Sequence, residues 1–178
     1  MMLLDYKELG SEPVKQLFVD VFGASEGMEE GLAIGGLVSN LIATTPSEDI
    51  FGFIATEDKQ LVGSIFFTRM TFDNGINAFI LSPVAIATSA QGKGVGQALI
   101  NFGINVLREH GVALLLTYGD PAYYGKVGFK PISEQVVKAP QIMSQPEGWL
   151  GQSLLGEDIV PIAGCSACVE ALNKPEYW

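Results

Sequence analysis

The chain has 178 residues, of which 48% are hydrophobic and 17% are charged, and its formal net charge is −10. This length fits one domain, and so apolar a composition argues against a disordered chain. The acidic balance argues against a nucleic-acid partner, because contacts to phosphates need clustered lysine and arginine.

The sequence also argues against a membrane partner. Its longest apolar stretch, residues 31–43, includes Ser39 and Asn40 and is too short to span a bilayer. The charged residues Asp5 and Lys7 come too early for a secretory signal. We therefore expect a soluble, cytoplasmic protein.

The N-terminal quarter is predicted to form a short strand and two helices. The strand is expected over residues 3–7. The first helix is expected over residues 11–22, with Ser11 as its cap and Gly23 as its stop. The second helix is expected over residues 26–42, before Thr45-Pro46-Ser47 breaks the chain.

An antiparallel meander is predicted for the middle of the chain. Its three strand-like runs cover residues 50–56, 60–71 and 77–86. The second turn, Asp73-Asn74-Gly75, carries the Asn-Gly signal that is typical of hairpins.

A strand–helix–strand crossover is predicted next. A helix over residues 95–110, stopped by Gly111, leads into a strand over 112–118, and such a connection implies parallel pairing with the preceding strand. A short helix over 122–127 and a strand near 129–132 follow. The pattern then weakens, with further candidate strands at 149–150 and 159–160.

This order of elements predicts an α+β fold with a mixed, mostly antiparallel central sheet and helices on both faces. We expect one domain over residues 1–178. Its core is expected over about 1–133, and residues 134–178 form a C-terminal extension that completes the sheet or the substrate side.

A glycine-rich turn, Gln91-Gly92-Lys93-Gly94-Val95-Gly96, joins an apolar strand to a helix. Glycines let backbone N–H groups converge, and the helix dipole adds partial positive charge, so the turn predicts a phosphate-bearing ligand. A dinucleotide fingerprint would need glycine at Gln97, and no Walker loop is present.

Two motifs resemble the GCN5-related N-acetyltransferase (GNAT) family. Gln91, Gly94 and Gly96 match its Gln/Arg-x-x-Gly-x-Gly/Ala motif for acetyl-CoA. Residues 119–129, Gly-Asp-Pro-Ala-Tyr-Tyr-Gly-Lys-Val-Gly-Phe, look like its Tyr-x-Lys-x-Gly-Phe region, in the version of the YhbS-like bacterial branch. The usual proline and aromatic residue before Gln91 are replaced by Thr88 and Ala90.

The resemblance implies acetyl-CoA as co-substrate, bound where a splayed parallel strand pair opens a groove. The cofactor-binding residues that it implies are Val84, Ala85, Ile86, Gln91, Gly92, Lys93, Gly94, Val95, Gly96, Gln97, Tyr124 and Lys126. Both lysines can instead be ordinary surface residues. The asparagine that many members carry after the fifth strand is not evident, and Thr117 lies near its place.

The resemblance also implies that Tyr124 is the general acid that protonates the CoA thiolate; the alternative is a core aromatic. Asp120 is the nearest candidate base, although aspartate before Pro121 is also a routine helix cap. Water is the alternative base.

The implied activity is N-acetyl transfer to a primary amine of a small molecule or a peptide. Two alternative functions remain, a non-catalytic acyl-CoA sensor and a transferase of longer acyl groups. The protein can in addition form a homodimer. Candidate liners of the acceptor pocket, which can equally be core residues, are Phe22, Met28, Met143 and Trp149. We predict no metal site, and we expect Cys165 and Cys168 to be reduced, packed thiols, with a redox pair or an intersubunit metal site as alternatives.

Overall fold

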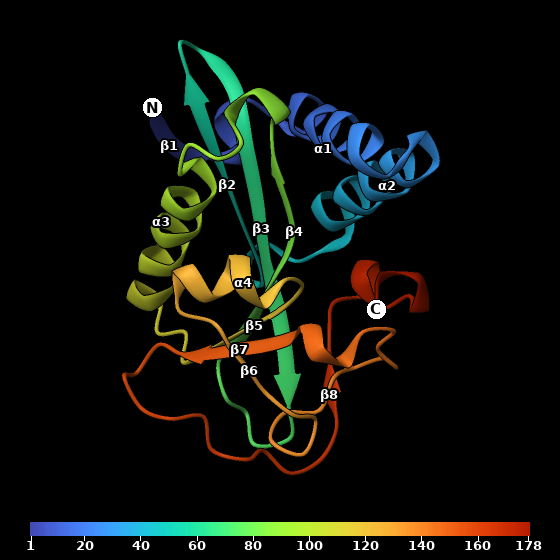
Figure 1. The fold of residues 1–178 in the computed structure, drawn as a ribbon. Helices are drawn as coiled ribbons and strands as arrows, with labels where there is room; N and C mark the ends of the chain where they lie inside the picture. The colour runs from blue at the N-terminus through green and yellow to red at the C-terminus, as the bar shows by residue number, and fades with distance from the viewer. The chain divides into compact units, whose positions relative to one another are not determined.

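The computed structural model describes residues 1–178 and confirms the α+β class, with an open, mostly antiparallel sheet and a parallel β4–β5 pair. The chain forms two compact units (Figure 1). The first contains Met1–Phe67 and Pro83–Ile104, and the second contains Thr68–Ser82 and Asn105–Trp178. Each unit is described separately below.

The elements follow the predicted order. The strands are β1 (Met2–Asp5), β2 (Ile50–Glu57), β3 (Gln60–Phe72), β4 (Ala78–Ile86), β5 (Leu114–Tyr118), β6 (Lys130–Pro131), β7 (Trp149–Ser153) and β8 (Ser166–Ala167). The α-helices are α1 (Ser11–Glu26), α2 (Met28–Thr44), α3 (Val95–Glu109) and α4 (Pro121–Tyr124). None of these helices combines the length and the apolar character needed to cross a bilayer.

In the first unit, helices cover both faces of the strands, as predicted (Figure 1). Successive side chains of β3 point to opposite faces. The Phe66 ring packs 6.0 Å from that of Phe18 on α1. The next residue, Phe67, lies on the other side, where its ring would be 2.5 Å from a Cβ added to Gly103 on α3. The sheet is therefore buried between α1 and α3.

The prediction that Gly23 ends the first helix is wrong. Helix α1 continues to Glu26, and Gly27, with a φ of 101°, separates it from α2. A Cβ added to Gly31 would lie 2.6 Å from the backbone oxygen of Val19 and 2.8 Å from the Cα of Gly23. Gly31 therefore allows α1 and α2, which lie side by side in Figure 1, to pack backbone against backbone.

In the second unit, β4 and β5 pair in parallel from Ala78 opposite Leu114 to Leu81 opposite Thr117. Strand β7 then pairs antiparallel with both β5 and β6, so the strand order is β4-β5-β7-β6. The C-terminal extension therefore contributes an internal strand of the sheet.

Smaller differences from the predicted elements lie at the C-terminal side. The candidate strand at 149–150 is confirmed as the start of β7, whereas residues 159–160 lie in no helix or strand. The short strand β8, which pairs antiparallel with Thr71 and Phe72 of β3, was not predicted, because two residues carry no periodic signal.

Candidate functional site

The glycine-rich turn belongs to the first unit and joins β4 to α3. After β4, a 3-10 turn over Thr88–Ala90 leads into residues 91–94, and α3 starts at Val95. The Ala98 N–H donates to the Gly94 oxygen at 3.0 Å, which is the first bond of the helical ladder. The amides ahead of Ala98 have no acceptor within the helix, so they are available to an anion.

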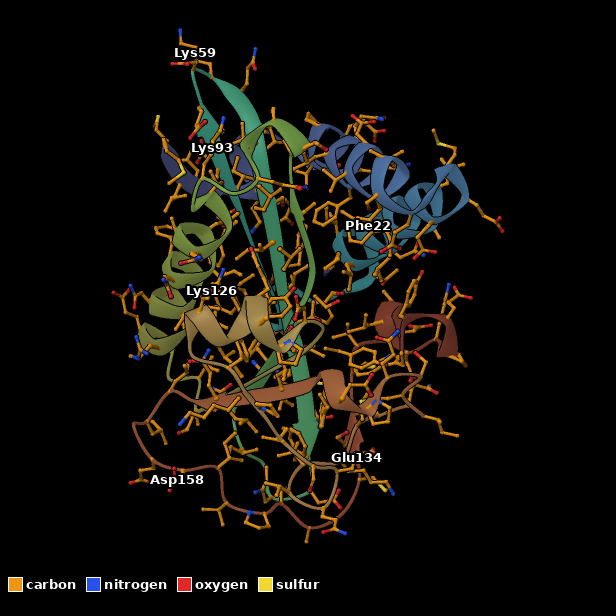
Figure 2. The ribbon with its side chains drawn as sticks, viewed as in Figure 1. Phe22, Lys59, Lys93, Lys126, Glu134 and Asp158 are labelled. Carbon is orange, nitrogen blue, oxygen red and sulfur yellow. The ribbon has the colours of Figure 1, made fainter.

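Two glycines shape this turn. Gly92 and Gly94 have φ angles of 73° and 80°, in the left-handed region that favours glycine. A Cβ added to either would meet no atom within 4 Å. The protein itself does not fill the space beside these two residues, so a ligand can approach the backbone of the turn. Lys93 between them is exposed, and Figure 2 shows it in the turn ahead of α3.

Gln91 fixes the turn to the end of the preceding strand. Its Nε2 donates to the Ile86 backbone oxygen at 3.0 Å. The Ala87 N–H donates to the Val62 oxygen of β3 at 2.8 Å, which holds the same corner from the other side. The side chain of Gln91 therefore shapes the turn, and its backbone N–H donates to the Thr88 oxygen at 3.4 Å, which closes the 3-10 turn before it.

The strand residues ahead of the turn are mostly buried. Pro83, Ala85 and Ile86 are buried, and Val84 is half-buried. Val95 and Gly96, at the start of α3, are also buried, whereas Gln97 is half-buried. Val84 and Gln97 are therefore the partly accessible members of the predicted cofactor set in β4 and at the start of α3.

Tyr124 lies in the second unit at the end of α4. Its ring packs edge-on against Tyr123 and Phe129, with centroid distances of 5.0 and 6.0 Å. A Cβ added to Gly119 would lie 2.7 Å from Cε2 of Tyr124, so only glycine at position 119 admits the ring in this place. The Gly119 N–H donates to the Gly148 oxygen at 2.9 Å, which ties this corner to the start of β7.

The environment of Tyr124 favours the neutral form of its phenol. Burial raises its pKa well above the usual value, and the nearby Tyr123 and Asp120 raise it further. Its hydrogen bond with the Thr117 side chain acts in the opposite direction and lowers the pKa. The Thr117 hydroxyl, which is fully buried, also donates to the Leu81 oxygen at 2.8 Å.

Asp120 caps the short helix that carries Tyr124. Its Oδ1 accepts the Ala122 N–H at 2.9 Å, and the side chain is exposed. The geometry therefore gives this carboxylate a structural task at the helix start. Lys126 is exposed beside α4 and is labelled in Figure 2.

The other candidate residues divide between core and surface. Trp149 and Met143 are buried, and the Trp149 indole donates to the Val137 oxygen at 2.8 Å, so both are core residues. Phe22 is half-buried on α1, and Met28 is 63% exposed on α2.

Cys165 and Cys168 are free thiols on either side of β8. Cys165 is exposed and Cys168 is half-buried, so the prediction that both thiols are packed is wrong for Cys165. No cluster of three or more metal-ligating side chains is present.

Sequence reasoning missed the parts played by Thr117 and Gly119. In the sequence, Thr117 stands out only by its place near that of an absent asparagine, and Gly119 only as part of a motif. The ring of Tyr124 contacts Gly119 because the turn between them brings the ring back toward the end of β5. No local sequence pattern predicts this contact.

Comparison with known proteins agrees with this geometry. Residues 48–131 match the family model of the acetyltransferase (GNAT) domain. The uncharacterised N-acetyltransferase YjhQ of Escherichia coli strain K12 is 30% identical over 140 residues, which are 75% of this chain and 77% of YjhQ. The uncharacterised N-acetyltransferase YhbS of the same strain is 31% identical over 81 residues, which are 44% of this chain and 48% of YhbS.

Solved structures share the fold. The crystal structure of Escherichia coli YhbS in complex with CoA has a TM-score of 0.82 and 20% identity, and the match covers 97% of this chain and 92% of that one. A GNAT family acetyltransferase from Brucella melitensis in complex with acetyl-CoA has a TM-score of 0.70 and 21% identity, with 96% and 97% covered.

Proposed function

Because the chain belongs to the GNAT family of N-acetyltransferases, for which acetyl-CoA is the co-substrate, we propose that it acetylates a primary amine of a small molecule or a peptide. The observation that carries this proposal is the turn at residues 91–94. It combines two glycines of positive φ, open space beside both and a helix start with free amides.

The turn fits the diphosphate of coenzyme A by its backbone. Amides at a helix start suit a doubly charged group, and the dipole adds to the attraction. We assign the diphosphate to the residues from Gln91 to Gln97 and the backbone of Val84, Ala85 and Ile86 to the amides of the pantetheine arm. Lys93 and Lys126 are exposed cations that suit the outer phosphates.

Acetyl-CoA supplies an activated acyl thioester, and the protein must supply a proton to the departing thiolate. We assign this proton to the phenol of Tyr124. Because burial raises its pKa, the phenol stays protonated at neutral pH and can donate to sulfur. The same raised pKa makes complete transfer costly, so the phenolate must be stabilised by a neighbour.

The base for the amine is a separate matter. Asp120 was the candidate, but its Oδ1 already accepts the Ala122 N–H and its side chain is exposed. We therefore assign Asp120 to the helix cap and propose that the amine loses its proton to water. The net charge of −10 favours the approach of a cationic amine.

The alternative function is a non-catalytic acyl-CoA sensor. It predicts binding of acetyl-CoA without turnover on any amine. The family match and the retained Tyr124 favour the enzyme.

The test begins with titration of acetyl-CoA by calorimetry, with succinyl-CoA and longer acyl-CoAs in parallel to define the acyl group. A panel of polyamines, amino sugars and short peptides is then screened for release of the CoA thiol. We expect saturable binding of acetyl-CoA and turnover with at least one amine. Absence of saturable binding overturns the proposal, and binding without turnover supports the sensor.

We propose that residues 1–178 act as one domain, because β3, β4 and α3 each contribute residues to both compact units. We propose a cytoplasmic location, because the reaction needs acetyl-CoA, which is an intracellular metabolite, and because both cysteines are free.

A further inference from the structure

The side chain of Tyr118, the last residue of β5, lies on the opposite face of the strand from that of Thr117. Its ring stacks on the ring of Trp178, with centroids 6.0 Å apart and an angle of 19° between the planes. Trp178 is itself buried, and its ring packs 5.9 Å from that of Trp149. The indole of Trp178 also donates to the Leu172 oxygen at 3.0 Å. The ring of Tyr118 is therefore held by a well-anchored residue of the C-terminal segment.

The hydroxyl of Tyr118 makes two hydrogen bonds whose directions are fixed. The Gln145 N–H donates to the phenol oxygen of Tyr118 at 2.6 Å. The Ser144 hydroxyl donates its single proton to the Trp178 backbone oxygen at 2.9 Å. Across the 3.2 Å between the hydroxyls of Tyr118 and Ser144, the phenol must therefore be the donor. The Tyr118 hydroxyl thus uses its proton and a lone pair to hold two successive residues of the turn that precedes β7.

This turn, residues 144–148, leads back to the residue beside Tyr118. The Gly148 N–H donates to the Gln145 oxygen at 2.9 Å, and the Gly119 N–H donates to the Gly148 oxygen at 2.9 Å. A Cβ added to Gly148 would lie 2.9 Å from the Gly119 oxygen and 3.4 Å from Cδ1 of Tyr118, so the turn packs directly against the end of β5. The hydroxyl of Tyr118 therefore fixes the backbone of Gly119 by way of the turn.

Gly119 in turn limits where the ring of Tyr124 can lie. A Cβ added to Gly119 would be 2.7 Å from Cε2 and 3.4 Å from Cδ2 of that ring. With so little clearance, a shift of the Gly119 backbone must either displace the ring or open a gap beside it. The ring also packs edge-on against Tyr123 and Phe129. Among these neighbours, Gly119 is the one that the 144–148 turn holds in place.

We propose that Tyr118 is a positioning residue for the phenol of Tyr124. Its hydroxyl holds the 144–148 turn, and this turn keeps Gly119 in contact with the ring. The inference rests on the proposed role of Tyr124 as the acid. Because the hydroxyl of Tyr118 is engaged by the turn, Tyr118 itself gives no proton to the thiolate.

The first measurement follows amide hydrogen exchange by NMR and needs no substrate. Tyr118→Phe keeps the ring and removes the hydroxyl, so the Gln145 N–H loses its acceptor. We expect the Gly119 amide to exchange about tenfold faster in this variant, since the loss of a hydrogen bond makes local opening easier. The amide of Leu115, which lies between two paired strands, should change less. A Gly119 rate that stays constant, or that rises no more than that of Leu115, overturns the inference.

Turnover separates this inference from the proposed function. With an amine found in the screen, Tyr118→Phe should lower kcat about tenfold and change the KM for acetyl-CoA less, because the phenol is displaced while the cofactor contacts remain. In a Tyr124→Phe background the same change should have no further effect on kcat. If Tyr124→Phe leaves kcat unchanged, the acid role itself fails. If Tyr124→Phe lowers kcat but Tyr118→Phe does not, only the role of Tyr118 fails.

Gln141→Ala is the matched control. The Gln141 Nε2 donates to Oδ1 of Asn173 at 2.7 Å, so this variant also removes a hydrogen bond to the C-terminal segment but leaves Tyr118 untouched. It should change neither the Gly119 exchange rate nor kcat, and an effect equal to that of Tyr118→Phe overturns the inference. If Tyr118→Phe does not fold, Ser144→Ala replaces it, because it interrupts the same hydrogen bonds at an exposed residue. A smaller change in the same direction is then expected, and no change overturns the inference.

Discussion

Substitution of Gly94 examines the proposed diphosphate site directly. Gly94 has a φ of 80°, and a Cβ added there would meet nothing within 4 Å. Alanine therefore fits in space, but it must hold a left-handed backbone at a cost of about 1–2 kcal/mol. For a chain of this length the cost corresponds to a fall in Tm of about 2–8 °C.

Gly75 provides a matched control. It lies in the turn between β3 and β4, with a φ of 73° and equally open space around an added Cβ. Gly75→Ala should therefore cost the same stability as Gly94→Ala. Any difference between the two variants in affinity for acetyl-CoA then reports on the ligand and not on strain.

Glutamate at position 94 should reduce the affinity for acetyl-CoA more than alanine does. Two unit charges about 6 Å apart repel each other by about 3 kcal/mol at an effective dielectric constant of about 20. Gly94→Glu should therefore weaken acetyl-CoA binding about 100-fold, and Gly94→Ala less, whereas Gly75→Glu should bind like the wild type. Calorimetry gives the affinities, and thermal melts give the stabilities. If Gly94→Glu and Gly75→Glu bind equally well, the turn does not hold the diphosphate and the reasoning is wrong.

Further predictions concern the acid, the helix packing and the thiols. Tyr124→Phe should lower kcat about 100-fold or more while acetyl-CoA still binds, and an unchanged rate of thiol release would contradict this. Because burial raises the pKa of Tyr124, the unfolded chain loses the phenol proton at lower pH than the folded chain does. The free energy of unfolding of the wild type should therefore fall as the pH rises above about 10. In urea melts, the free energy of unfolding of Tyr124→Phe should fall less over the same pH range. Gly103→Ala should lower the free energy of unfolding by about 1–3 kcal/mol, since its Cβ would lie 2.5 Å from a phenylalanine ring. Gly36→Ala, where an added Cβ meets open space, should raise it by about 0.5–1 kcal/mol by stabilising α2. Equal urea midpoints for the two variants would refute this. Exposed Cys165 should react with iodoacetamide near neutral pH before Cys168, whose pKa is raised by burial to about 11; mass spectrometry of the labelled peptides checks the order, and equal rates would be the contrary result.

The parts of the fold that sequence reasoning predicted are those with local causes. The start of α3 at Val95 follows from the glycines before it and the apolar periodicity after it. The Asn74-Gly75 turn and the cap at Asp120 likewise depend on a few neighbouring residues. The positions of the turn and of the helix start could therefore be predicted from the sequence.

The parts that were missed depend on contacts between distant segments. Gly23 looks like a helix stop in the sequence, but α1 continues through it, and the glycine that the close approach of α2 requires is Gly31. Thr117 looks like an ordinary strand threonine until Leu81 and Tyr124 meet it from two other elements. Such roles arise only when the chain folds back on itself, and periodicity does not record them.

The insertion of β7 between β5 and β6 has a consequence for biosynthesis. Both earlier strands lack a neighbour on their shared side until Ser153 has been made. In the nascent chain the edge of β5 therefore stays unpaired, and this strand contains the apolar residues Leu114, Leu115 and Leu116. An unpaired apolar edge strand can pair with strands of other molecules. The second unit can mature only after β7 has left the ribosome, so a chaperone that shields this edge would be most useful between the synthesis of β5 and that of β7.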